Sequence, residues 1–253
     1  MIHSIQKTLI ATALLAALGA QAATVTVASG GSYKGLQLTG ADTISFSTDL
    51  LGALDTGKVV LSPVNGTTGV IQKDVDGFYT QADITAQLKS FDINDSTNRI
   101  VNAYSVGGSN QAQPALKSVS SGGFVTIGDL WIDRTAKVVH GTLTGGNGVG
   151  TISDLIVWNI ASIQGDSAIT AAGSYTTTFS GLTVTTTAFD AIAKSLGLLT
   201  LGKSALSGVT DFGTITSHLT VTAVTPPIPE PATYAMMGLG LIGVAVAARR
   251  RRG

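Results

Sequence analysis

Alternating apolar and polar residues predict β-strands through most of the chain between residues 23 and 224. An apolar side chain at every second position is the pattern of a strand that buries one face. Valine, isoleucine and threonine fill these segments, as expected for a pleated and half-buried surface. The clearest early segments are 24–27, 43–47 and 58–61. Turn signals rich in glycine, asparagine and aspartate separate them, at 30–32, 55–57 and 63–66.

The strongest β signal lies between residues 121 and 188. Its apolar runs are 123–132, 137–143, 151–158 and 175–179. Residues 126–130 (Thr-Ile-Gly-Asp-Leu) and 151–155 (Thr-Ile-Ser-Asp-Leu) are almost identical, and each leads to a tryptophan. Two copies are too few to indicate a solenoid. We therefore interpret them as two similar strands of one meander.

One segment, 188–199, has a helical rather than a strand period. Its apolar residues are Phe189, Ile192, Ala193, Leu196 and Leu199. This spacing predicts a short helix that Thr187 could cap and Gly197 could end. Residues 67–120 are less regular, and strands resume at 212–224. The pattern predicts one all-β domain over 23–224, an antiparallel β-sandwich or jelly-roll-like fold with one short helix.

The N-terminus has the features of a signal peptide. A short segment with one positive charge, Lys7, precedes an apolar run at 9–18 that is too short for a stable membrane span. Ala20, Ala22 and Ala23 then form the small-residue site of a signal peptidase. We expect residues 1–22 to be a signal helix that is removed on export.

The C-terminus has a second membrane-targeting pattern. A proline-rich linker at 225–231 leads to an uncharged apolar run of 17 residues, 232–248. As a helix this run would span roughly 26 Å, near the lower limit for a bilayer core. An arginine cluster occupies 249–253, and arginines beside a membrane span stay in the cytoplasm. The pattern predicts a transmembrane helix with its C-terminus inside.

The order of these C-terminal parts resembles the PEP-CTERM sorting signal of Gram-negative bacteria. The resemblance covers about a tenth of the chain and leaves the central domain unidentified. It implies an exported protein whose tail is removed by a membrane protease of the exosortase type. The motif that the protease would recognise is Pro229, Glu230 and Pro231. The residues that would hold the tail in the cytoplasm are Arg249, Arg250, Arg251 and Arg252.

The same resemblance implies a transient tether to the inner membrane, then delivery to the cell envelope or extracellular matrix. Members of the family are often linked to exopolysaccharide and biofilm, but their central domains are diverse. An ordinary C-terminal anchor would explain the helix and the arginines. It would not explain why Pro-Glu-Pro precedes the helix, or why Glu230 is the only glutamate in the chain.

The composition of the exported part excludes several classes of protein. Between residues 23 and 228 there are 10 basic residues and 14 aspartates, a net charge of about −4. A nucleic-acid partner is therefore excluded, because it requires a basic surface. The chain contains no cysteine, which excludes disulfides and thiol catalysis.

Residues capable of catalysis are sparse. Removal of the signal peptide leaves His140 and His218, whereas a zinc site needs three or four ligands. Either histidine could pair with an aspartate. A glycosidase would need two carboxylates, for which the candidates are Asp129, Asp133, Asp154 and Asp166. We expect no catalytic residue, no metal and no cofactor.

Two acidic turns leave a weak calcium site open. Asp74-Val75-Asp76-Gly77 resembles the opening of a calcium loop but lacks the later ligands. A second turn, 92–95, adds further oxygen donors. We interpret both as turns stabilised by Asp and Asn side chains.

Two functions fit this sequence. The first is a structural or adhesive matrix protein, whose threonine- and serine-rich strand faces contact exopolysaccharide. The second is a glycan-binding or small-ligand-binding protein, or a polysaccharide hydrolase. Its possible stacking platforms are Trp131, Trp158, Tyr104 and Tyr175, if they do not simply belong to the core. Either protein would meet a signal peptidase and an exosortase-like protease during export.

Overall fold

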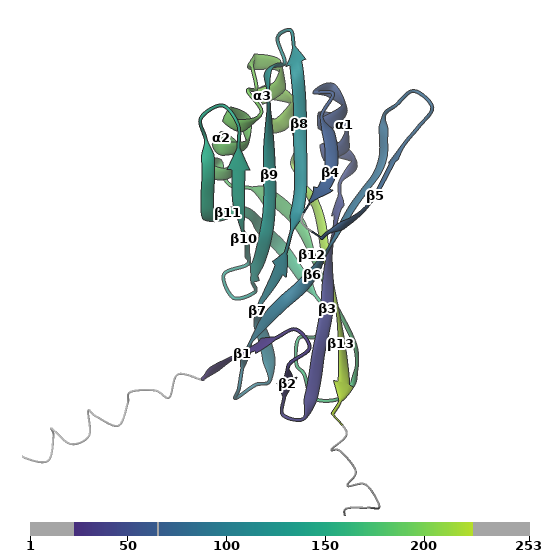
Figure 1. The fold of residues 1–253 in the computed structure, drawn as a ribbon, viewed down its shortest axis with the longest axis vertical. Coiled ribbons are helices and arrows are strands. Elements are labelled where there is room, and N and C mark those ends of the chain that lie inside the picture. Colours follow the sequence, from purple (N-terminus) through teal and green to yellow (C-terminus); the bar gives the residue numbers. More distant parts are fainter. Residues whose placement is uncertain (1–22, 65, 225–253) are drawn as a thin grey trace, which may run out of the picture. The chain divides into compact units, whose positions relative to one another are not determined.

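The computed structural model describes residues 23–64 and 66–224 (Figure 1). The first part of this domain forms seven strands, β1 (Thr24–Ala28), β2 (Ser32–Tyr33), β3 (Leu36–Phe46), β4 (Val60–Val64), β5 (Thr68–Lys73), β6 (Tyr79–Asn94) and β7 (Arg99–Val106). The second part forms six, β8 (Gly108–Leu116), β9 (Ser120–Asp133), β10 (Val138–Gly145), β11 (Gly150–Gln164), β12 (Gly173–Val184) and β13 (Gly213–Ala223). Three helices interrupt them, α1 (Thr48–Thr56), α2 (Thr186–Ser195) and α3 (Thr200–Ser207).

Eight of the strands close into an antiparallel β-barrel. Their order around the ring is β6, β3, β13, β12, β11, β10, β9 and β7, and β7 returns to β6. Strand β7 completes the ring because it pairs with β6 along one edge and with β9 along the other, where Tyr104 faces Trp131. The predicted sandwich or jelly roll is therefore wrong. Long, twisted strands can curl one sheet until its edges meet, and no second sheet is then needed to bury the inner face.

The region that the sequence pattern left irregular, 67–120, contains the strands that close the barrel. Strand β6 alone is 16 residues long and pairs with β1, β3, β5 and β7. Its register with β7 shifts at two places, which breaks the simple alternation of outward and inward residues. The two-residue period holds from Ala82 to Leu88 and is lost beyond it, so the period covers only part of the strand.

The repeated sequence in β9 and β11 corresponds to a repeated β-bulge. Asp129 and Asp154 occupy matching positions in the repeat, and both have left-handed backbone angles, with φ of +48° and +55°. Each lies at a register shift against β10, the strand that β9 and β11 flank. The prediction of two similar strands in one meander is confirmed.

The bulge in β9 sets the junction between β7 and β8. The backbone N–H of Asp129 donates to the carbonyl of Gly107 at 2.8 Å, and the N–H of Gly107 donates to Asp129 Oδ1 at 3.0 Å. Next to this junction, a Cβ on Gly108 would overlap the carbonyl oxygen of Ile127. Only glycine fits where the two backbones approach so closely.

The three helices lie at one end of the barrel, at the top of Figure 1. The helix predicted over 188–199 is present as α2, but it begins earlier, because Thr185 rather than Thr187 caps it, and it ends at Ser195, before Gly197. The prediction of a single helix is wrong. Helix α1 is capped by Ser47 and buries Leu50, Leu51 and Leu54. It escaped the sequence pattern because it is short and ends in the turn signal 55–57.

The interior contains two hydrophobic clusters. The larger one lies at the helical end and includes Leu50, Val125, Phe179 and Ile192. The smaller one lies around β1, β2 and the adjoining part of β6, and includes Leu38, Phe91 and Ile93. Alternate residues of β3 point inward, so Leu38 joins the smaller cluster while Ile44 and Phe46 pack against the larger one.

Within the described part of the chain, no helix has both the length and the apolar character needed to cross a bilayer. The signal helix predicted at 1–22, the linker at 225–231, the transmembrane helix predicted at 232–248 and the arginine cluster at 249–253 lie outside the described residues.

Candidate functional site

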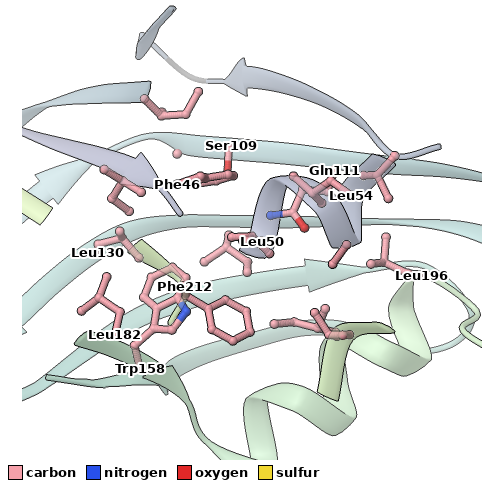
Figure 2. A pocket seen from close by; sticks show the side chains of 18 of the residues that line it. Phe46, Leu50, Leu54, Ser109, Gln111, Leu130, Trp158, Leu182, Leu196 and Phe212 are labelled. Carbon is pink, nitrogen blue, oxygen red and sulfur yellow. The ribbon is translucent and has the colours of Figure 1, made fainter. Parts of the chain in front are cut away.

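A cavity of about 70 Å³ lies inside the barrel at its helical end. Side chains from β-strands and from all three helices line it, and most of them are apolar. Figure 2 shows Phe46, Leu50, Trp158 and Phe212 converging on it from different elements. One water molecule needs ~10–15 Å³ of such space. The cavity is therefore large enough for several waters or for one small molecule.

Three of the buried side chains that line this mainly apolar cavity carry polar atoms without a partner. Asp42, Gln113 and Trp158 are exposed to only 7%, 5% and 7%. Asp42 Oδ1, both amide atoms of Gln113 and Trp158 Nε1 have no hydrogen-bond partner among the described residues. An unsatisfied buried polar group costs about 1–3 kcal/mol. Three such groups around one cavity are the pattern of a ligand site, where a few polar groups fix the orientation of an apolar molecule.

Different strands bring these groups to the cavity. Asp42 occupies an inward position of β3, between the two hydrophobic clusters and opposite Ala86 of β6. Gln113 points inward from β8, where its amide lies against Gly57 at the end of α1. Trp158 comes from β11. The polar groups therefore reach the cavity from two strands of the ring, β3 and β11, and from β8, which pairs with β9 outside the ring.

The position of Asp42 changes its ionisation. Burial raises the pKa of Asp42 to about 6, and a hydrogen bond with the Ser217 hydroxyl acts in the opposite direction. Loss of water disfavours the charged form of a carboxyl group. Asp42 thus changes its charge inside the cavity under mildly acidic conditions.

A second cluster lies on the outer face of the barrel, where three rings stand side by side on β7, β9 and β10. The Trp131 ring centroid lies 5.6 Å from Tyr104 on one side and 3.8 Å from His140 on the other. Asp154 Oδ1 accepts hydrogen bonds from Trp131 Nε1 and His140 Nδ1, both at 2.9 Å. Because neighbours cover both faces of Trp131, a sugar ring has no face of this tryptophan on which to stack.

Asp92 anchors the other end of this outer cluster. Burial opposes its ionisation, but hydrogen bonds from Thr26, Asn102 and Tyr104 outweigh that effect and lower the pKa of Asp92. Burial, with the hydrogen bond to Asp92, raises the pKa of Tyr104 to about 12. Tyr104 therefore acts as a donor to the carboxylate, at 2.7 Å.

The other two aromatic candidates, Trp158 and Tyr175, pack against the hydrophobic clusters. Trp158 lies in the interior beside the cavity. Tyr175 packs against the smaller cluster, and its hydroxyl donates to the carbonyl of Ala171 at 2.8 Å. Trp158 is therefore a core residue, whereas Tyr175 is only partly buried.

The candidate acids and bases are distributed over the barrel. His140 pairs with Asp154, so the expected histidine–aspartate pair is present, while His218 Nδ1 lies 3.2 Å from the hydroxyl of Thr176. Asp129 holds the β9 bulge and Asp133 accepts from the N–H groups of the following turn. Asp166 lies 3.9 Å from Arg99. Each carboxylate has a different partner.

The turn at 74–77 forms as interpreted, but residues 92–94 belong to strand β6 and the second turn follows them at 95–98. Asp74 Oδ1 accepts from the N–H groups of Asp76 and Phe78, and Asn94 Oδ1 accepts from those of Ser96 and Thr97. Over residues 23–64 and 66–224, no group of three or more His, Asp or Glu side chains could hold a metal ion.

Sequence reasoning missed Asp42 and Gln113. One signal was available for Asp42, since it interrupts the inward series Leu38, Gly40, Ile44 and Phe46 of β3 with an ionisable residue. Gln113 had no comparable signal, because β8 lies in the irregular region.

Comparison with known families identifies the C-terminus. The model of the PEP-CTERM protein-sorting motif matches residues 227–252, a range that includes Glu230 and its flanking prolines. The chain thus carries this sorting signal, as predicted, and the signal implies an extracellular protein that an exosortase sorts. No curated protein and no solved structure matches the chain.

Proposed function

We propose that the exported domain is a non-enzymatic protein that encloses a small, mainly apolar molecule in its barrel. The observation that carries this proposal is the set of unpartnered polar atoms of Asp42, Gln113 and Trp158 around one apolar cavity. Barrels of eight strands have room for one small ligand. The dispersed carboxylates and histidines, each with its own partner, support a binding role over catalysis.

Trp158 provides a direct test of ligand binding. The chain has two tryptophans, so Trp131→Phe leaves Trp158 as the only reporter, and it lines the cavity. We expect native mass spectrometry of protein collected outside the cells to show a bound small molecule. After its removal, adding the molecule back should shift the Trp158 emission.

A variant with a filled cavity is the matched control. Ala86 lines the cavity opposite Asp42, so Ala86→Leu places a larger apolar side chain in that space. This variant should fold, as judged by its melting transition, and should neither carry the molecule nor respond to it. Absence of a bound molecule from the unaltered protein, together with unchanged Trp158 emission across a panel of small molecules, would refute the proposal.

The sorting signal supports a specific route for this domain. In our proposal, the apolar segment 232–248 tethers the chain to the inner membrane while Arg249, Arg250, Arg251 and Arg252 remain in the cytoplasm. An exosortase recognises Pro229, Glu230 and Pro231, removes the tail, and releases the domain to the cell envelope or matrix. The intact mass of the extracellular protein tests this route, because a processed chain ends near residues 228–232.

A contact with neutral exopolysaccharide is a second candidate function, favoured by a hydroxyl-rich outer face. The outward cross-strand pairs of β12 and β13 are Ser174 with Thr220, Thr176 with His218, and Thr178 with Thr216. Such a face offers many donors and acceptors without charge. If this function is correct, Thr176→Val with Thr178→Val should weaken binding to the matrix polysaccharide, whereas Ala86→Leu should leave it unchanged.

A further inference from the structure

Asp42 is the only ionisable side chain among the described residues that line the cavity. The neighbouring inward residues are Ala86 on β6, Ser217 on β13 and Ser105 on β7, and none of them carries a charge. Only burial and the Ser217 hydroxyl alter the ionisation of Asp42. A buried carboxylate needs a cation or several hydrogen-bond donors, because it has lost its hydration shell. The described wall of the cavity offers no cation.

The volume of the cavity limits the size of a molecule that can enter it. An apolar cavity of about 150 Å³ admits benzene, whereas this cavity measures about 70 Å³. The occupant must therefore be narrow and have few non-hydrogen atoms. Apart from Asp42 and a few uncharged polar groups, among them the Gln113 amide, the wall is apolar, with Phe46, Leu130 and Phe212 among its side chains. A short hydrocarbon chain fits this wall, and a positive group fits the carboxylate.

Building on the proposed ligand-binding function, we infer that the cavity binds a short aliphatic amine whose ammonium group pairs with Asp42 Oδ1. The ammonium supplies the positive charge that the described cavity wall lacks and donates to the carboxylate, while the alkyl chain fills the apolar space. The geometry should make the cavity select an amine over a neutral molecule, because its single carboxylate lies at an inward position between the two hydrophobic clusters.

The test compares amines with alcohols of the same length. Linear amines from propylamine to hexylamine, and the matching 1-alkanols, are titrated at pH 8 into the exported chain carrying Trp131→Phe, and Trp158 emission is followed. We expect butylamine to bind at least tenfold more tightly than 1-butanol. Equal affinities at every chain length would overturn the inference.

Two variants and a pH series complete the test. Asp42→Asn preserves the shape of the side chain and should remove the preference for the amine while leaving 1-butanol binding unchanged. Asp76→Asn, at an exposed turn, should keep the preference. In the unaltered cavity, amine affinity should fall by about tenfold from pH 8 to pH 5, since Asp42 gains a proton, with no such change for the alcohol.

The outcomes separate this inference from the function on which it rests. Binding of alcohols and amines alike retains the small-ligand function and overturns the amine assignment. Binding of neither class, when the natural ligand also fails to appear by mass spectrometry, overturns both. Persistence of the amine preference in Asp42→Asn, or in unaltered protein at pH 5, overturns the role of Asp42.

Discussion

At the scale of single residues, Asp42 is a buried carboxyl group whose ionisation affects the stability of the fold. Its pKa of about 6 lies above the value of ~3.9 for a solvated aspartate. The folded state therefore holds this proton more tightly than the unfolded state does. The stability that protonated Asp42 contributes is complete below about pH 4 and is lost as the pH rises through 6.

Asp42→Asn should therefore stabilise the empty protein in a pH-dependent way. At pH 8 we expect a gain of about 1–3 kcal/mol in the free energy of unfolding, because asparagine carries no buried charge. At pH 4 the gain should shrink towards zero. Urea denaturation at both pH values measures this difference. An equal effect of the substitution at pH 4 and pH 8 would contradict the assignment, and the exposed Asp76→Asn serves as the control.

Two alanines on β6 provide a test of the cavity itself. Ala82 and Ala86 are both buried, but only Ala86 lines the cavity. Ala82→Val should cost about 1–3 kcal/mol of stability, because the surrounding core is full. Ala86→Val should cost less than about 1 kcal/mol, because the added methyl groups enter open space. Urea denaturation compares the two variants, and equal costs would show that the cavity is not open to the side chain at 86.

At the scale of elements, the bulges of β9 and β11 shape the barrel wall. Each contains an aspartate in the left-handed region, and each aspartate uses its carboxylate differently, with Asp129 bound to a backbone N–H and Asp154 to two side chains. A bulge increases local twist and bends its strand. The two bulges beside β10 therefore help the sheet to curl towards closure.

Gly108 and Gly52 make a matched pair for testing this wall. Alanine at 108 would collide with the carbonyl of Ile127 in the adjacent β9, so Gly108→Ala should lower stability by about 3 kcal/mol or more. Gly52 lies in α1, where an added Cβ meets nothing within 4 Å, so Gly52→Ala should raise stability by about 0.5–1 kcal/mol. Thermal unfolding measures both changes. A mild effect at 108 would mean that β8 and β9 lie farther apart.

At the scale of the whole molecule, the chain combines a short sorting signal with a folded domain. The signal at 227–252 directs the protein to an exosortase, whereas the proposed ligand site lies in the folded domain. The sorting signal works as a local sequence, while the cavity depends on strands from the whole domain. Changes in one part are therefore expected to leave the other intact.

Glu230→Ala tests this separation. The substitution should leave export and the Trp158 response unchanged, but the extracellular or envelope fraction should retain Arg249, Arg250, Arg251 and Arg252, since the protease loses its motif. Intact-mass measurement after membrane solubilisation detects the retained tail. Pro226→Ala, just before the matched range, is the control and should be trimmed normally. Normal trimming of the Glu230→Ala protein would exclude Glu230 as a recognition residue.

The sequence by itself determined the features that depend on neighbouring residues. Alternation located strands such as β1 and β12, a 3.6-residue period located α2, and the repeat at 126–130 and 151–155 marked two equivalent strands. The sorting signal was also predictable, because its motif, apolar run and arginines are read in order along one short stretch. Each of these depends on spacing within about twenty-five residues.

Only the tertiary structure decided that the sheet closes and that it encloses a cavity. Closure depends on β7 pairing with both β6 and β9, and no local pattern states which strands meet across the ring. Asp42, Gln113 and Trp158 are 45 or more residues apart in the chain, and only long-range strand pairing brings them to one cavity. Local periodicity shows which face of a strand is buried, whereas long-range pairing decides what that face surrounds.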